Sequence, residues 1–267
     1  MNKKAIVTGG SRGIGQGIVL ALARDGFDVA FSYASAVDKA METKEKAEKE
    51  YGIKCYCFQA KLEHREEGKH FFEEAVEALG GLNVFVNNAG STVFEPLGSI
   101  TEEGLDYLTE LDFKCFILMM NRAARYMIDH GCKGSLINIT SSRGERAYPE
   151  DGLYGALKAG INRAIQSFAL DVAPHGIRVN NVAPGAVRVR TNEERIAMGR
   201  NPYFWDELGT RIPLGRCGLP TDIADMVAFL ASDQASYVTG ITIRVDGGLI
   251  LPGPPEDAAS DSVPAGN

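Results

Sequence analysis

The sequence predicts an α/β fold, a doubly wound parallel sheet of about seven strands in a single domain. Apolar runs of strand length alternate with helical patterns, which is typical of parallel βαβ units. A length of 267 residues with 45% hydrophobic composition allows a substantial core, and α/β folds of this size commonly form one domain. The first apolar run leads directly into a glycine-rich turn and then a helical pattern, as at the start of a βαβ unit.

The order of the elements follows from the spacing of apolar residues. Short apolar runs predict strands at residues 5–8, 28–33, 54–58, 83–87, 135–139, 178–182 and 242–245. Apolar residues recur at spacings of three and four, which predicts helices, near residues 13–25, 37–51, 64–79, 101–130, 152–173 and 220–231. Because helices fall between strands, the chain can return each time to a parallel neighbour.

The glycine-rich turn lies in the segment KKAIVTGGSRGIG. Glycines stand at positions 9, 10, 13 and 15, and a helical pattern follows from Ile14 to Arg24. The missing side chains let the backbone approach a pyrophosphate, which the N–H groups and the positive dipole end of the helix then face. An ordinary turn or close backbone packing also explains glycines, but the strand and helix on either side favour a dinucleotide site.

Tyr154 and Lys158 stand four residues apart in a predicted helix, thirteen residues after Ser141. Of the nine tyrosines, only Tyr154 has a lysine at this offset. Positions i and i+4 share a helix face, so the ammonium can lie beside the ring. A positive charge about 4 Å from a forming phenolate stabilises it by roughly 4 kcal/mol at an effective dielectric of about 20, which permits proton exchange with an alcohol or ketone. Alone, the pair is also explained by a packed tyrosine and a solvated lysine.

Several motifs follow one another along the chain: T-G-x(3)-G-I-G, Asn87-Asn88-Ala89-Gly90, Ser141, Tyr154-x(3)-Lys158 and Pro184-Gly185. In this order the chain resembles the short-chain dehydrogenase/reductase family over nearly its whole length, including members like glucose and hydroxysteroid dehydrogenases and 3-oxoacyl-ACP reductases. The resemblance implies a Rossmann-like oxidoreductase that binds a nicotinamide dinucleotide and moves a hydride. It also implies a homotetramer, built partly through the predicted helices near 101–130 and 152–173.

The resemblance also implies roles for the motif residues. Tyr154 is similar to the family's acid/base, Lys158 to the cation that promotes its ionisation and anchors the ribose, and Ser141 to the donor that holds the substrate oxygen. The expected cofactor-binding residues are Gly9, Ser11, Arg12, Gly13, Ile14, Gly15, Tyr33, Asn88, Ala89, Gly90, Tyr154, Lys158, Pro184, Gly185 and Val187. Asn87 and Asn88 could equally fix the loop through side-chain to backbone hydrogen bonds.

The end of the second strand favours NADP over NAD. Rossmann folds that bind NAD usually have a carboxylate there, which hydrogen-bonds to the ribose hydroxyls. This strand ends Phe31-Ser32-Tyr33-Ala34-Ser35 without an acid. Tyr33 occupies the position of the acid in NAD-preferring relatives. The Arg12 guanidinium, in the glycine turn, could pair with a 2′-phosphate. We therefore expect NADP with NAD possible; Ala34 replaces a second arginine of many relatives, and Arg12 could merely cap or solvate the loop.

Two residues depart from the family pattern near the cofactor and the catalytic lysine. Lys61 stands where relatives commonly have an aspartate that touches the adenine amino group. Asp112, in the segment LTELDFKCF, stands where relatives carry an asparagine that bends a helix and holds a water bonded to the lysine. We count Asp112 in the expected catalytic set, because an ionised carboxylate would stabilise the Lys158 ammonium and oppose a Tyr154 phenolate, moving oxidation toward alkaline pH. If the alignment is shifted by a residue, Asp112 is a plain helix-surface acid.

A third departure follows Pro184-Gly185, where relatives often have a threonine and this chain has Val189. Val187 and Val189 could still orient the nicotinamide ring through backbone groups. Four arginines lie close in sequence to the expected mouth of the site and could bind a carboxylate, sulfate or phosphate of the substrate; surface charge also explains them. They are Arg143, Arg146, Arg188 and Arg190.

Composition excludes several classes of function. A net charge of −7 gives no basic footprint for nucleic acid. No apolar stretch reaches the roughly 20 residues needed to span a bilayer, so we expect a cytoplasmic protein without membrane partners. The five cysteines show no C-x-x-C spacing and the four histidines lie far apart, so we expect neither disulfides nor a metal site.

We expect a catalytic domain at residues 1–251, with a substrate lid near 186–219, and a flexible tail at 252–267 that is rich in proline, alanine and acid. The expected function is hydride transfer between NADP(H) and a secondary alcohol or ketone of a small or medium molecule such as a sugar, polyol, hydroxy acid or sterol. Two alternatives are a catalytically weak sensor or scaffold that binds the dinucleotide, and an epimerase or dehydratase that keeps its cofactor bound.

Overall fold

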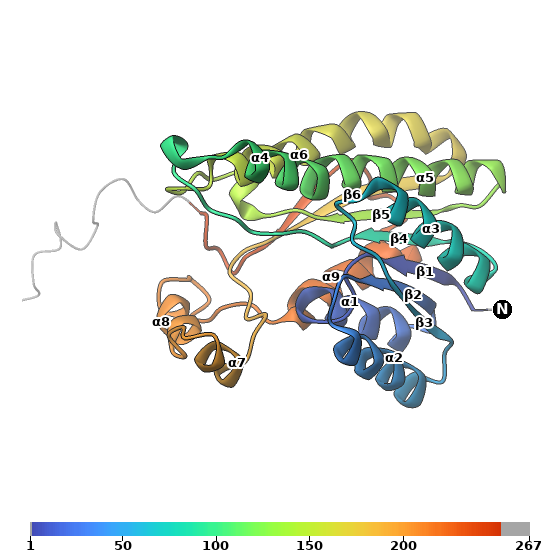
Figure 1. The fold of residues 1–267 in the computed structure, drawn as a ribbon. Helices are drawn as coiled ribbons and strands as arrows, with labels where there is room; N and C mark the ends of the chain where they lie inside the picture. Colours follow the sequence, from blue (N-terminus) through green and yellow to red (C-terminus); the bar gives the residue numbers. More distant parts are fainter. Residues whose placement is uncertain (1, 252–267) are drawn as a thin grey trace, which may run out of the picture.

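The computed structural model describes residues 2–251 and confirms the predicted α/β class. Seven strands form one parallel sheet in the order β3-β2-β1-β4-β5-β6-β7 (Figure 1). The strands are β1 Lys4–Val7, β2 Asp28–Tyr33, β3 Cys55–Gln59, β4 Val84–Asn87, β5 Gly134–Ile139, β6 Ile177–Pro184 and β7 Thr242–Val245. The chain progresses outward from β1 in one direction and then from β4 in the other, so the switch point where ligands bind in such sheets lies between β1 and β4.

Helices cover both faces of the sheet (Figure 1). Those helices are α1 Gly13–Arg24, α2 Val37–Tyr51, α3 Arg65–Leu79, α4 Glu102–Thr109, α5 Cys115–Asp129, α6 Gly152–Val172 and α9 Pro220–Ala231, and two short helices, α7 Asn192–Ala197 and α8 Phe204–Gly209, lie apart from the sheet (Figure 1). Buried side chains of α1, α2 and α9 form one hydrophobic cluster with the sheet, and those of α3, α5 and α6 form a second. The arrangement is therefore three layers with the sheet in the middle.

Strand β1 shows why the strands are apolar throughout. Ala5 and Val7 belong to the cluster under α1, whereas Ile6 belongs to the cluster under α3 and α5. All three are fully buried, because successive side chains point to opposite faces and both faces carry helices. The predicted apolar runs thus correspond to strands covered on both sides.

The region predicted as one helix near 101–130 is interrupted. A π-helical turn, Glu110–Lys114, separates α4 from α5. It carries the buried side chain of Asp112, whose carboxylate faces the interior. Such turns insert one residue into a helix and often mark functional sites. The predicted helix near 101–130 is thus helical throughout residues 102–129, and the π-turn within it was not predicted, because apolar spacing does not show an inserted residue.

Buried asparagines align β4, β5 and β6. Asn87 is opposite Asn138, and Asn138 is opposite Asn181. The Asn87 amide donates to Asn138 Oδ1 at 2.9 Å, and the Asn138 amide donates to Asn181 Oδ1 at 2.9 Å. The Asn181 amide reaches Thr242 Oγ1 on β7 at 3.2 Å. These neutral groups form an amide ladder across four neighbouring strands.

The segment expected as a lid, residues 186–219, contains α7 and α8. Thr191 begins α7 with a capping box that it shares with Glu194. Arg188 and Asp206 form an ion pair that connects the start of the segment with α8. Closure over a ligand stays a prediction, and the expected flexible tail at 252–267 lies outside the described residues.

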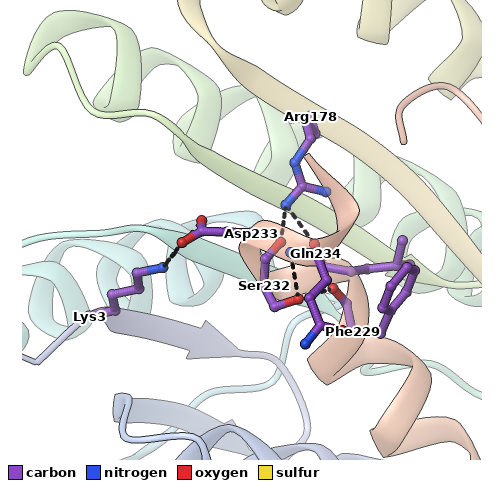
Figure 2. Close-up of polar contacts among 7 residues, drawn as sticks. Lys3, Arg178, Phe229, Ser232, Asp233 and Gln234 are labelled. Carbon is purple, nitrogen blue, oxygen red and sulfur yellow. Dashed lines mark hydrogen bonds and ion pairs between the residues drawn. The ribbon is translucent and has the colours of Figure 1, made fainter. Parts of the chain in front are cut away.

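The C-terminal end of α9 is capped by a side chain from β6 (Figure 2). Arg178 Nη2 donates to the Leu230 carbonyl at 2.7 Å and to the Ser232 carbonyl at 3.2 Å. Both acceptors lie at the helix end, where carbonyls lack intrahelical partners. Burial lowers the pKa of Arg178 from its usual value. An exposed ion pair lies beside this cap: Lys3 Nζ and Asp233 Oδ2 are 3.3 Å apart.

Arg178→Met should lower the free energy of unfolding by about 2 kcal/mol, because it leaves two carbonyls without a charged donor. The measurement is urea unfolding at neutral pH. Lys3→Met is the matched control and should change the free energy by less than about 0.5 kcal/mol, since the Lys3 pair is exposed. Equal effects of the two substitutions would contradict the capping role.

Candidate active site

The carboxyl ends of the parallel strands place the expected motifs at one edge of the sheet. The glycine turn follows β1, Asn88 to Gly90 follow β4, Ser141 follows β5, and Gly185 follows β6. Because β1, β4, β5 and β6 are consecutive neighbours, these segments lie side by side. One site can therefore involve all four.

Close packing explains the glycines of the turn. A Cβ on Gly15 would lie 2.0 Å from the Gly9 carbonyl oxygen and 2.5 Å from Asn88 Nδ2, so no larger residue fits. Gly13 has a φ of +55°, a left-handed value that favours glycine. No side chain caps the first turn of α1, so its N–H groups remain available to an anion. These features fit the pyrophosphate of a dinucleotide.

Asn88 and Thr8 hold the turn against the end of β4. The Asn88 amide donates to the carbonyls of Thr8 and Gly9 at 2.9 and 3.1 Å. Thr8 Oγ1 accepts from the backbone N–H groups of Asn88 and Ala89 at 2.8 and 2.9 Å. The structure thus shows the side-chain to backbone bonds proposed for Asn88, while contact of Asn88 and Ala89 with the adenine ribose stays a prediction.

A groove of about 540 Å³ extends from the glycine turn along the segment after β6. Arg12 lines it with an exposed side chain and makes no capping hydrogen bond. Lys39, from the first turn of α2, lines the same groove, and sequence reasoning missed it because a lone surface lysine carries no motif. Glu42, Glu193 and Glu194 also line the groove, so its charge is mixed.

The expected cofactor contact Tyr33 and the departure from the family pattern at Lys61 lie at the ends of neighbouring strands. Tyr33 is half-buried at the end of β2 and packs against the core cluster under α1. Lys61, just after β3, has an exposed side chain, and its backbone N–H donates to Glu67 Oε2 at 2.7 Å. Neither Tyr33 nor Lys61 can supply the carboxylate that would accept hydrogen bonds from an unphosphorylated ribose.

Tyr154 and Lys158 lie on one buried face of α6. Tyr154 is 8% exposed and Lys158 is 3% exposed. Lys158 Nζ lies 5.5 Å from the centroid of the Tyr154 ring and 4.3 Å from that of Phe116. The cation is therefore adjacent to the phenol ring, as the i, i+4 spacing predicts.

Asp112 pairs directly with Lys158. Its side chain is fully buried, and Oδ1 lies 2.8 Å from Lys158 Nζ. Oδ2 accepts from the backbone N–H of Ser91 at 2.9 Å. The Lys158 contact lacks hydrogen-bond geometry and leaves Oδ1 without a hydrogen-bond partner among residues 2–251, so the attraction is chiefly coulombic. The alternative that Asp112 is a surface acid is wrong, because the π-helical turn rotates it inward.

Ser141 begins a single 3-10 turn, Ser142–Gly144, after β5. Its Oγ accepts from the backbone N–H of Arg143 at 3.1 Å. With this lone pair occupied, the hydroxyl hydrogen can rotate to donate to a substrate oxygen. Ser141 and Tyr154 are both largely buried, at 9% and 8% exposure.

The segment after β6 is fixed by backbone contacts. Gly185 approaches Asp246 so closely that a Cβ would lie 2.7 Å from the Asp246 Cβ. Val187 is buried and bridges to Gly218. Pro184, the last residue of β6, is also buried. These contacts orient the backbone that the resemblance assigns to the nicotinamide.

Four residues beside the site were missed by sequence reasoning. They are Phe94, Phe116, Tyr148 and Asp151, which contact Tyr154, Lys158 or Arg143. None belongs to a short motif, and only the folded chain brings them to the same edge. Within residues 2–251, no group of three or more His, Cys, Asp or Glu residues could hold a metal ion, and no helix is long and apolar enough to cross a membrane.

Comparisons with known proteins agree with this geometry. The family model described as Enoyl-(Acyl carrier protein) reductase matches residues 9–250. The 3-oxoacyl-[acyl-carrier-protein] reductase FabG of Staphylococcus epidermidis is 38% identical over 94% of this chain and 100% of its own. The 3beta-hydroxysteroid dehydrogenase 1 of Eggerthella lenta is 35% identical over 93% of this chain and 94% of its own. The crystal structure of acetoin dehydrogenase YohF from Salmonella typhimurium has a TM-score of 0.87 at 33% identity and covers 96% of this chain and 99% of its own.

Asp112→Asn should lower the free energy of unfolding by about 3 kcal/mol, because it leaves the buried Lys158 ammonium without its counter-charge. In a Lys158→Met background the same change should cost at least about 1 kcal/mol less. The measurement is a double-mutant cycle by urea unfolding. Additive effects within about 0.5 kcal/mol would show that the two side chains do not interact.

Proposed function

We propose that this chain, which belongs to the short-chain dehydrogenase/reductase family, transfers a hydride between NADP(H) and a secondary alcohol or ketone. The family makes it an NAD(P)-dependent oxidoreductase. The proposed substrate is a small or medium molecule such as a sugar, polyol, hydroxy acid or sterol. The observation that carries the proposal is the Lys158 ammonium beside the Tyr154 ring, at the sheet edge where Ser141 also lies.

In this proposal Tyr154 and Ser141 act on the same substrate oxygen. During oxidation the Tyr154 phenolate accepts the hydroxyl proton, and during reduction the phenol returns it. Ser141 donates its hydroxyl hydrogen, because its Oγ already accepts from the Arg143 N–H. The Lys158 cation favours the phenolate, and Asp112 offsets part of that charge and holds the ammonium in place.

Two features of the glycine turn suit a dinucleotide: the backbone segments approach closely at Gly15, and no side chain caps the first turn of α1, so its N–H groups can bind the pyrophosphate. When bound, the nicotinamide supplies or accepts the hydride. Two observations support NADP: β2 ends without a carboxylate, and the exposed Arg12 lines the groove together with Lys39. Arg12 can pair with a 2′-phosphate, whereas Lys39 already pairs with Glu42 Oε2 at 3.0 Å.

The names of relatives support an alcohol or ketone substrate, since they include a 3-oxoacyl reductase, a 3beta-hydroxysteroid dehydrogenase and an acetoin dehydrogenase. We also propose a cytoplasmic homotetramer in which residues 186–219 close over the substrate. The sensor alternative is favoured by one observation, the Asp112 carboxylate that partly neutralises Lys158. An intact set of Ser141, Tyr154 and Lys158 favours turnover.

The test is a panel of alcohols and carbonyls with NADPH, NADH, NADP and NAD. Turnover of at least one carbonyl is expected, and Tyr154→Phe should lower kcat/KM by about 100-fold or more, because proton transfer to the substrate oxygen is lost. Nucleotide binding by the Tyr154→Phe protein, followed by fluorescence, controls for folding. Tight nucleotide binding by the wild-type protein without turnover on any compound would favour the sensor.

Arg12→Gln should lower kcat/KM for NADPH by about 10-fold or more and change that for NADH by less than about 3-fold, because only the 2′-phosphate loses a charged donor. Steady-state kinetics with the same carbonyl measure both values. Arg163→Gln, an exposed change of equal charge on α6, is the control and should leave the nucleotide preference unaltered. Equal losses with both nucleotides would contradict recognition of the 2′-phosphate by Arg12.

A further inference from the structure

Three residues form an aromatic wall next to Tyr154: Phe94, Arg143 and Tyr148. The Arg143 guanidinium carbon lies 4.3 Å from the Phe94 ring centroid and 4.4 Å from the Tyr148 ring centroid, so it stacks on both rings. The Phe94 ring meets the Tyr154 ring edge to face, with centroids 6.0 Å apart and planes at 87°. The wall is thus in direct contact with the proposed acid/base.

The charge in the wall is compensated. Arg143 Nη1 lies 2.9 Å from Oδ2 of Asp151, which is 3% exposed. Asp151 Oδ1 also accepts from the backbone N–H of Tyr148 at 3.2 Å. Arg143 is therefore held by one carboxylate and two rings and brings no net charge to the site.

Of the other arginines and lysines close in sequence to the site, Lys158 and Arg188 are paired and Arg146 is exposed. Lys158 pairs with Asp112 at 2.8 Å, and Arg188 pairs with Asp206. Arg146 is exposed, and its guanidinium carbon lies 5.7 Å from the centroid of the Tyr148 ring. Arg190 lines the cofactor groove. A substrate carboxylate beside Tyr154 would lose water, and the two cations described around the Tyr154 and Phe94 rings, Lys158 and Arg143, are already paired with buried carboxylates. Its binding there is therefore unfavourable.

Hydrogen bonds connect residues of the wall with the segments that carry Ser141 and Tyr154. The backbone N–H of Arg143 donates to Ser141 Oγ, and the carbonyl of Asp151 accepts from Gly155, the residue after Tyr154, at 2.7 Å. The Arg143–Asp151 pair therefore links the turn that presents Ser141 to the first turn of α6, which presents Tyr154. A molecule whose oxygen meets both hydroxyls would therefore lie next to the Phe94 ring, which contacts Tyr154.

Phe94 leaves apolar surface open for a ligand. Arg143 stacks on its ring, yet 41% of the residue remains exposed. A flat apolar group packed there would remove this surface from water and complete an aromatic contact.

We infer that the substrate is an uncharged ketone or alcohol with an aromatic or other flat apolar group next to the reacting carbon, and that Phe94 is the residue that selects it. The inference rests on the proposed hydride transfer and narrows its substrates. Hydroxy acids are poor substrates under this inference, because their carboxylate meets compensated charges only.

The experiment compares three ketones at saturating NADPH: acetophenone, methyl 4-acetylbenzoate and 4-acetylbenzoate. The ester and the acid differ mainly in charge, so size is controlled. The expected kcat/KM is about 100-fold or more lower for the acid than for the ester. An acid used as well as the ester overturns the inference.

Two variants extend the test. Asp151→Asn uncovers the Arg143 charge and should raise the acid-to-ester ratio of kcat/KM about 10-fold. Phe94→Ala should lower kcat/KM for acetophenone at least about 10-fold more than that for acetoin, a small aliphatic ketone. Leu97→Ala, a change of an apolar residue that is 91% exposed on the same loop, is the control and should alter neither value.

The outcomes separate the two proposals. If the wild-type protein reduces no carbonyl of any kind, the proposed function fails. If it reduces other carbonyls but none of the three aryl ketones, or if Phe94→Ala affects acetophenone and acetoin equally, the substrate inference fails and the proposed function stands.

Discussion

The parallel register of the sheet is the constraint on which the site depends. Four neighbouring strands, β1, β4, β5 and β6, end at the same edge, and each is followed directly by a segment of the site. Because both faces of these strands are covered by helices, the only open approach to the polar backbone is at the strand ends.

Around Tyr154, two cations are each paired with a carboxylate. Lys158 lies against Asp112, and Arg143 lies against Asp151. Each pair contains a fully or almost fully buried carboxylate that also accepts a backbone N–H. Lys158 lies beside the Tyr154 ring, and Arg143 stacks on the Phe94 ring that meets Tyr154 edge to face. Because each cation is paired with a buried carboxylate, the two pairs add little net charge around Tyr154.

The fold was predictable from the sequence because its signals are local. Apolar runs marked all seven strands, and the glycine turn marked the first crossover. The i, i+4 spacing also predicted that Lys158 and Tyr154 would share a helix face. The sequence could not show the π-helical turn at Asp112, since one inserted residue barely alters the apolar spacing.

The neighbours of the site were harder to predict. Phe94, Tyr148 and Asp151 come from loops whose contacts depend on how two strand ends approach each other. Arg143 was noted as a possible anion receptor, but its compensation by Asp151 is visible only in three dimensions. Charge counting along a chain cannot distinguish a paired guanidinium from an available one.

The amide ladder from Asn87 through Asn138 to Asn181 has a consequence for how the molecule responds to its surroundings. Amides do not ionise, and hydrogen bonds between buried neutral groups are hardly screened by salt. The contribution of this ladder to the alignment of β4, β5 and β6 is therefore the same in acid and in alkaline solution, and in dilute and in concentrated electrolyte. The pH dependence of the fold comes instead from ionisable groups such as the buried Lys158–Asp112 pair.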